Sequence, residues 1–240
     1  MRDTNLYWVL SLAFILNTIN MSAQNNGGKE QYLDARQQGL AAISALTATG
    51  NIEKLEIQLN TALDAGLTIN EIKEALVQLY AYCGFPRSLN GINRFMQVLE
   101  ERKKRGIIDV VGKEATPLRD SSDTYERGRK TLEVLTNMPQ AKPAPGFGEF
   151  APRIDAFLKE HLFADIFDSN VLDYQQRELV TISALTAMHG TEGQLQAHIR
   201  MGMNTGITAE QLNAVFSIIE KSVSKEQAEK ARAVLSNISK

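Results

Sequence analysis

Two side chains suited to proton transfer stand in one stretch, residues 177–206, RELVTISALTAMHGTEGQLQAHIRMGMNTG. Glu178 opens one predicted amphipathic helix and His198 lies in the middle of the next. Imidazole and carboxylate groups serve as general acids and bases near neutral pH, so we predict catalytic roles for both residues. The structural alternatives are a histidine packed at a helix interface and a glutamate that stabilises a helix N-terminus.

Four neighbouring residues are predicted to contact a substrate. Thr191 and Gln194 precede His198 by two helical turns and one, so the three side chains share a face. The same threonine and glutamine would also form a helix capping box, which is the alternative. Arg177 and Arg200 could bind a substrate carboxylate through a bidentate contact, the alternative being solvated surface arginines.

Composition excludes several other kinds of chemistry. A single cysteine, Cys83, cannot form an internal disulfide, and we interpret it as a small buried side chain. His161 and His189 are predicted to be structural, and the three histidines lack zinc-site spacing, so no metal is expected. No phosphate-binding glycine loop is present, and no cofactor is implied. A net charge of −2 without a basic cluster argues against nucleic acid as a partner. The expected partner is a small-molecule substrate.

The elements that would position these residues are all helical, because no stretch shows a convincing alternation of period two. Residues 138–152 hold four of the six prolines and are predicted to be irregular. Pro86 disfavours helical geometry at Phe85, so a helix break is predicted at 83–86. Capping boxes are predicted at Thr68 and Thr208. The expected helices cover residues 38–49, 52–65, 68–82, 87–104, 125–137, 154–167, 177–187, 192–206, 209–221 and 224–235.

The helical hairpin of residues 177–206 has a counterpart earlier in the chain. The letters ISALTA occur at 43–48 and again at 182–187, an offset of 139 that becomes 140 after the turn. Each hairpin alone would expose an apolar stripe, so we predict that the two pack face to face. The residues expected to be buried are Leu55, Leu59, Leu195 and Ile199.

The two copies differ at the acid–base pair. Gly39 stands where the second copy has Glu178, and Gln58 stands where it has His198. We therefore predict that any catalysis resides in the second copy.

These letters resemble the carboxymuconolactone decarboxylase family, whose superfamily includes the AhpD-type alkylhydroperoxidases. The stretch 177–208 carries most of the resemblance. Residues 64–92, DAGLTINEIKEALVQLYAYCGFPRSLNGI, add the family's tail with Tyr82 and Gly84, and YERGRKTLEVL from Tyr125 resembles its leading helix. The resemblance implies an all-α, AhpD-like helical repeat with tandem units at 32–105 and 121–240. It also implies a homo-oligomer, a trimer.

The resemblance allows more than one activity. Alkylhydroperoxidases need the order Cys-x-x-Cys-x-x-x-His, and Thr191 and Gln194 hold the two cysteine positions before His198. We therefore expect a decarboxylase-like enzyme that uses the histidine and Glu178 on a small lactone or carboxylate. The alternatives are a peroxiredoxin-like antioxidant protein, for which the thiol pair is absent, and a non-catalytic binding scaffold.

The N-terminal residues are predicted to be a signal peptide. An apolar run of 11 residues, 6–16, is too short to span a bilayer and is followed by the small residues Ser22 and Ala23. We expect cleavage after residue 23 and export to the periplasm, with no membrane association of the mature chain. The alternatives are an N-terminal anchor and a buried helix.

Overall fold

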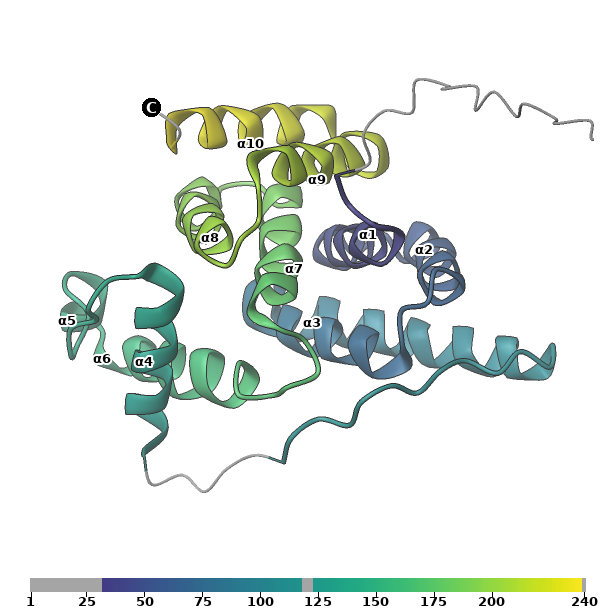
Figure 1. Cartoon of the computed structure of the whole chain (residues 1–240), viewed down its shortest axis with the longest axis horizontal. Coiled ribbons are helices and arrows are strands. Elements are labelled where there is room, and N and C mark those ends of the chain that lie inside the picture. The colour runs from purple at the N-terminus through teal and green to yellow at the C-terminus, as the bar shows by residue number, and fades with distance from the viewer. Residues whose placement is uncertain (1–31, 118–122, 239–240) are drawn as a thin grey trace, which may run out of the picture. The chain divides into compact units, whose positions relative to one another are not determined.

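A computed structural model describes residues 32–117 and 123–238 of the chain (Figure 1). These residues form helices joined by turns and extended segments, and none of them lies in a β-strand, which confirms the all-α prediction. None of the helices described is both long enough and apolar enough to cross a bilayer. The predicted signal peptide, 1–23, lies outside the described residues.

The first unit consists of α1 (Ala35–Thr49), α2 (Ile52–Asp64) and α3 (Ile69–Lys104). Gly50 ends α1 with a φ of 73°, a left-handed conformation that glycine adopts at little cost. The predicted capping box at Thr68 is confirmed: its hydroxyl accepts from the backbone N–H of Glu71, and the Glu71 carboxylate accepts from the backbone N–H of Thr68.

Helix α3 is kinked near the predicted break. The non-helical residue is Gly84, with φ 79° and ψ 158°, rather than Phe85. Glycine reaches positive φ without the Cβ clash that any other residue would suffer, so it takes up the change of direction. Pro86 then falls in the first turn after the kink, where its missing N–H leaves no helical hydrogen bond unmade.

The second unit consists of α7 (Tyr174–Ala187), α8 (Glu192–Asn204), α9 (Ala209–Ser222) and α10 (Lys225–Ile238). The predicted capping box at Thr208 is confirmed, with Gln211 as its partner. The capping box expected at Thr191 and Gln194 is wrong. The Thr191 hydroxyl instead donates to the carbonyl of Leu185 over 2.8 Å, so it completes the end of α7 and does not cap α8.

The two units pack against each other through matching helices. The first helices of the two hairpins, α1 and α7, lie against one another, and each also contacts the other unit: α1 touches α9 and α7 touches α3 (Figure 1). The four residues predicted to be buried are all at most 3% exposed: Leu55, Leu59, Leu195 and Ile199. They lie on α2 and α8, each of which packs against the first helix of its own unit. The face-to-face prediction is therefore confirmed.

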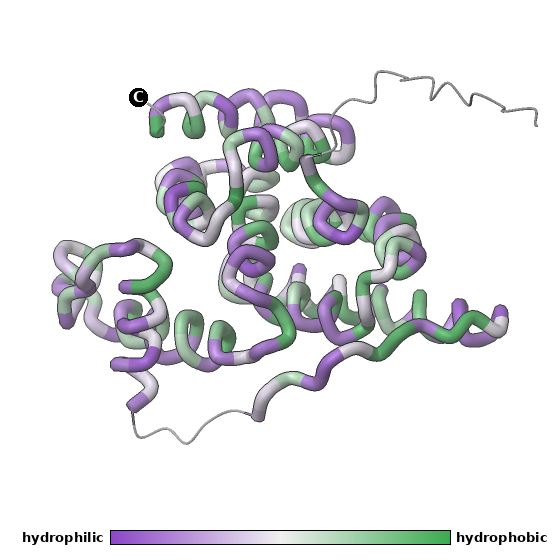
Figure 2. The backbone as a smooth tube through the Cα atoms, viewed as in Figure 1, coloured by the Kyte–Doolittle hydropathy of each residue, from purple (hydrophilic) through white to green (hydrophobic). Residues whose placement is uncertain are grey.

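An apolar extended segment, 107–111, follows α3 and returns to its start (Figure 2). The carbonyls of Val110 and Val111 accept hydrogen bonds of 2.9 Å from the backbone N–H groups of Ile69 and Asn70. These are amides of the first turn of α3, which have no partner within the helix. The segment thus completes the N-terminus of α3.

The connection between the units contains α4 (Thr124–Thr136), α5 (Phe147–Phe150), α6 (Pro152–Ala156) and η2 (Phe157–Ile166). Two predictions need correction here. The region 138–152, predicted to be irregular, includes the single-turn helix α5. The helix predicted over 154–167 is α6 followed by a π-helix, η2, because apolar periodicity does not distinguish i→i+4 from i→i+5 hydrogen bonding.

Helix α4 and η2 pack unusually closely. A Cβ added to Gly128 of α4 would lie 1.7 Å from the carbonyl oxygen of Lys159 in η2, so only glycine fits. The Lys159 ammonium is buried, and it contacts the carboxylate of Asp155 at 2.9 Å and the hydroxyl of Tyr125 at 2.9 Å. Burial alone would raise the pKa of Asp155, but hydrogen bonds from Tyr125 and Lys159 outweigh it and lower the pKa below its ordinary value.

Candidate functional site

Glu178 and His198, predicted from the sequence to act together, are in contact. Nδ1 of His198 on α8 lies 2.8 Å from Oε2 of Glu178 on α7. Glu178 is fully buried and His198 is 7% exposed. Helix α7 begins at Tyr174, so Glu178 lies beyond its first turn, where a helix dipole contributes little. The position of Glu178 therefore favours its contact with the imidazole over a role at the helix terminus.

A glycine lets the two helices bring this pair together. Gly202 follows His198 by one helical turn, and a Cβ there would lie 2.8 Å from Cδ1 of Ile182 and 3.7 Å from Cβ of Glu178. The close approach of α8 to α7 therefore depends on the missing side chain.

The first unit has the opposite arrangement at the matching positions. Its glycine is Gly39 on the first helix, and the residue matching Gly202 is Ala62 on the second. A Cβ on Gly39 would lie 2.9 Å from the Cβ of Ala62, so a larger side chain does not fit there. The packing of the first unit therefore leaves no room for a glutamate at position 39.

His198 lines a cavity of about 1300 Å³ between α3, α4, η2 and α8. Its Nδ1 faces Glu178, whereas Nε2 makes no hydrogen bond with the described residues. A carboxylate that accepts from Nδ1–H fixes the tautomer and leaves Nε2 as the nitrogen that gains or loses a proton. The pair is therefore arranged as an oriented acid–base group at a cavity wall.

The first unit contributes Tyr82 to the same cavity. The ring of Tyr82, at the end of the first half of α3, lies 5.4 Å from that of His198 at an interplanar angle of 78°. Burial, and then the negative charge of Glu178, raise the pKa of Tyr82 well above its ordinary value, so the phenol stays protonated. The site is thus composite. Sequence reasoning noted Tyr82 only as a family letter and assigned it no role, because its contact with His198 joins segments 116 residues apart.

The four residues predicted to bind substrate are placed differently from one another. Gln194 lines the cavity beside His198. Thr191 does not, since its hydroxyl is bonded to Leu185, and Arg200 is exposed and also lies outside the lining.

Arg177 requires the largest correction. It is fully buried, and its guanidinium donates to Oε1 of Glu74 at 2.7 Å and to Oε1 of Gln78 at 2.9 Å. A further bond of 2.9 Å reaches the carbonyl of Ser169. Arg177 is therefore neither a surface residue nor directed at the cavity, and its contacts join α7 to α3 across the two units.

Apolar and aromatic side chains form most of the cavity wall, and many come from η2. One histidine predicted to be structural, His161, also lines it, and its Nδ1 lies 3.2 Å from Oδ2 of Asp165. Apolar residues of the wall include Leu132, Ile154, Phe157, Leu158, Leu162 and Phe163.

The single thiol is placed for packing. Sγ of Cys83 donates to the carbonyl of Leu79 over 3.1 Å, and Cys83 is not among the residues that line the cavity. Burial raises the pKa of Cys83 to about 11, although the positive charge of Arg87 opposes the shift. A thiol of that pKa is almost entirely protonated at neutral pH. Cys83 is only partly buried, so the prediction of a buried side chain is confirmed only in part.

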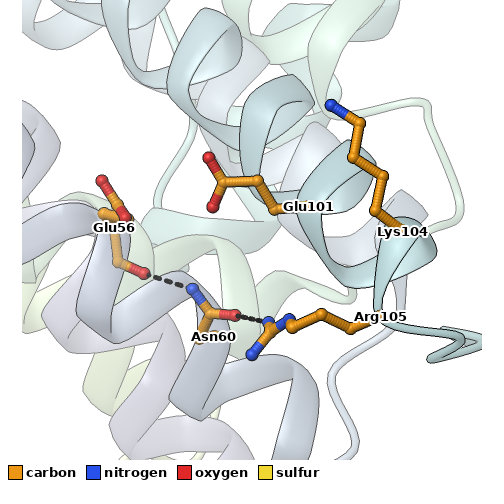
Figure 3. A pocket seen from close by; sticks show the side chains of 5 residues that line it. All are labelled: Glu56, Asn60, Glu101, Lys104 and Arg105. Atoms are coloured by element: carbon orange, nitrogen blue, oxygen red, sulfur yellow. Dashed lines mark hydrogen bonds between the residues drawn. The ribbon is translucent and has the colours of Figure 1, made fainter.

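A second hollow lies between α2 and the C-terminal end of α3 (Figure 3). It measures about 480 Å³ and shares no lining residue with the cavity at His198. In it Asn60 donates to the backbone carbonyl of Glu56 over 3.0 Å and accepts from Arg105 over 3.4 Å. Within residues 32–117 and 123–238, no group of three side chains is placed to bind a metal ion.

Comparison with known families matches the chain to the carboxymuconolactone decarboxylase family over residues 19–95 and 152–237. The chain belongs to this family. The two separate matches confirm the tandem units and the AhpD-like all-α fold, and they include Tyr82, Glu178 and His198. Residues 96–151, with α4 and α5, lie between them. A search of curated proteins finds no significant match.

Proposed function

We propose that the chain is a decarboxylase-like enzyme whose second unit transfers a proton at a substrate carbon through His198. The observation that carries the proposal is the 2.8 Å contact between Nδ1 of His198 and the buried carboxylate of Glu178, at the wall of a cavity large enough for a substrate. The ring of Tyr82 of the first unit packs against the imidazole, and its hydroxyl is buried.

The chemistry follows from the orientation of the imidazole. When Nε2 removes a proton from carbon, the imidazolium gains a positive charge that the Glu178 carboxylate stabilises through Nδ1–H. The electron pair left on the substrate passes to its carbonyl oxygen, which gives an enolate. Return of the proton to a different carbon rearranges a lactone. In a decarboxylation, the carbon that loses CO₂ takes the proton instead.

The cavity favours a lactone over a substrate held by its carboxylate. Arg177 and Arg200 were predicted to bind a carboxylate, but neither is among the lining residues. No other arginine and no lysine of the described residues lines the cavity either. A carboxylate at this site would therefore have no cationic partner.

The test begins with a screen of small lactones and carboxylates for loss of substrate, followed by mass spectrometry. His198→Gln should then lower kcat by about 10²–10⁴-fold, the usual contribution of a positioned acid–base group. Glu178→Gln should lower it less, because the imidazole remains present but is less firmly oriented. Glutamine is a suitable replacement for His198 because Gln58 occupies the matching position of the first unit.

The matched control is His189→Gln, which alters an exposed histidine in the turn between α7 and α8. It should leave kcat unchanged. A His198→Gln chain with the kcat of the wild type and an unaltered circular-dichroism spectrum would contradict the proposal.

We also propose that the chain is exported and forms a trimer. Export predicts a mature N-terminus at Gln24, and mass spectrometry that finds an intact Met1 in the native host would contradict it.

Assembly into a trimer is supported by apolar residues at helical spacing on the second half of α3. They are Phe85, Leu89 and Met96, each at least half exposed. The double variant Leu89→Lys/Met96→Lys should dissociate the trimer in sedimentation experiments, and a wild-type monomer would exclude it.

A further inference from the structure

The charge of the cavity at His198 is unusual for a site that accepts small acids. Among the described residues its lining includes two carboxylates, Glu160 and Asp165, and neither lysine nor arginine. Its second histidine, His161, contacts the carboxylate of Asp165 at 3.2 Å. Any positive charge on His198 is already matched by Glu178 at 2.8 Å. An anion that entered would be desolvated without a cationic partner, which is costly.

The size of the cavity also points away from a minimal substrate. Its volume of about 1300 Å³ exceeds the range of roughly 300–1000 Å³ that is usual for ligand pockets. The polar groups Gln194 and His198 stand one turn apart on α8, whereas Leu132, Phe157 and other apolar residues form the greater part of the wall. Such a wall gains free energy by covering an apolar surface.

Part of this wall comes from the segment between the two family matches. Thr124, Leu132 and Thr136 of α4 and Phe147 of α5 line the cavity, and all lie within residues 96–151. The close contact at Gly128 holds α4 against η2, which supplies a further part of the wall. Most of the lining therefore comes from the matched units, and the segment between them adds these four residues.

We propose that this cavity binds an electrically neutral, largely apolar organic molecule that presents one oxygen function to His198, and that it discriminates against anions. The inference rests on the proposed function for the role of His198, and it adds the substrate class: a neutral lactone or related carbonyl compound with an apolar body. Such a substrate has no carboxylate to lose, so the reaction is the rearrangement and not the decarboxylation. The carboxylates of Glu160 and Asp165 reinforce the discrimination by repelling negative charge.

A pair of fluorescent probes with the same aromatic skeleton tests the charge preference. N-phenyl-1-naphthylamine is neutral, and 1-anilinonaphthalene-8-sulfonate carries one negative charge. We expect the neutral probe to bind the purified chain at one site and at least tenfold more tightly than the sulfonate. Equal or tighter binding of the sulfonate, or no binding of the neutral probe, would overturn the inference.

Matched variants on α8 test whether the probe occupies this cavity. Ala197 lines it and is exposed, whereas its exposed neighbour Gln196 does not line it. Ala197→Trp should weaken binding of the neutral probe at least tenfold, and Gln196→Trp should leave it unchanged. Equal effects of the two variants would place the probe elsewhere and overturn the inference.

A charge introduced into the wall provides a second test that does not depend on filling the cavity. Ile154 lines the cavity and is half exposed, so Ile154→Lys is compatible with the fold. Ile154→Lys should raise the affinity for the sulfonate at least fivefold, and the affinity for the neutral probe should not rise. The probes report occupancy and not turnover. Failure of catalysis would therefore leave the binding result standing, and failure of binding would leave the proton-transfer proposal open.

Discussion

The reactivity of Cys83 is a quantitative prediction that separates an acid–base enzyme from a thiol-dependent antioxidant protein. Alkylation of the thiol by iodoacetamide proceeds through the thiolate, so its rate follows the thiolate fraction. Burial raises the pKa of Cys83 from the ordinary value of 9.0 to about 11. The group is therefore almost entirely protonated over the neutral range, and its reactivity rises about tenfold per pH unit until the pH approaches 11.

The expected rate follows from these two pKa values. At pH 8 a thiol of pKa 9.0 is roughly 9% ionised and one of pKa 11 about 0.1%, a difference of about 90-fold. The more basic thiolate is the better nucleophile, by roughly eightfold for a Brønsted coefficient of about 0.4–0.5. The net effect is a reaction about tenfold slower than that of a free thiol, and limited access through the surrounding side chains slows it further.

The assay compares the folded chain with the same chain unfolded in guanidinium chloride, using mass spectrometry to follow alkylation at pH 8. We expect the folded rate to be at least tenfold lower. Arg87→Gln should slow it further, because the positive charge of Arg87 opposes the rise in the pKa of Cys83. A folded rate within twofold of the unfolded rate would refute the argument and support the antioxidant alternative.

Three further predictions concern stability. Gly128→Ala should lower the free energy of unfolding by about 1–3 kcal/mol in urea titrations, because the added methyl would meet the backbone of η2. Gly193→Ala, which has open space around it, should leave the free energy of unfolding unchanged. Equal effects of the two variants would contradict the close contact. Arg177→Met should lower the free energy of unfolding by about 3 kcal/mol or more, because it breaks a buried ion pair. Arg200→Met alters an exposed residue and should lower it by less than about 0.5 kcal/mol. Similar values for the two variants would contradict the burial of Arg177. The pKa of Asp155 is lowered in the folded chain, so its carboxylate stabilises the fold above the unfolded pKa of about 3.9 and this contribution is lost as the pH falls. The melting temperature of Asp155→Asn should therefore fall less between pH 5 and pH 3 than that of the wild type, and parallel curves would exclude the effect.

The fold and the acid–base pair could be predicted from the sequence because both leave local signals. The repeat at 43–48 and 182–187 is a run of identical letters, and capping at Thr68 and Thr208 depends on residues three positions apart. Glu178 and His198 were found together because one hairpin contains both, and two helices joined by a short turn pack against each other.

The rest of the site depends on contacts between distant segments. Arg177 was predicted to bind a substrate carboxylate, with a surface arginine as the alternative, because nothing near it in sequence shows that Glu74 and Gln78 bond its guanidinium. Tyr82 reaches His198 only because the two units pack together. The cavity wall was missed for a related reason: helical periodicity in residues 154–167 does not reveal the wider turns of η2.

Proton transfer at carbon by His198 is the central claim, and deuterium incorporation measures it without knowledge of the final product. Neutral unsaturated lactones are incubated with the chain in D₂O, and exchange at the carbon next to the carbonyl is followed by NMR. The account predicts exchange above the buffer rate in the wild type and in His189→Gln, and a loss of about 10²–10⁴-fold in His198→Gln with an unchanged melting temperature. Exchange at the wild-type rate in folded His198→Gln would contradict it.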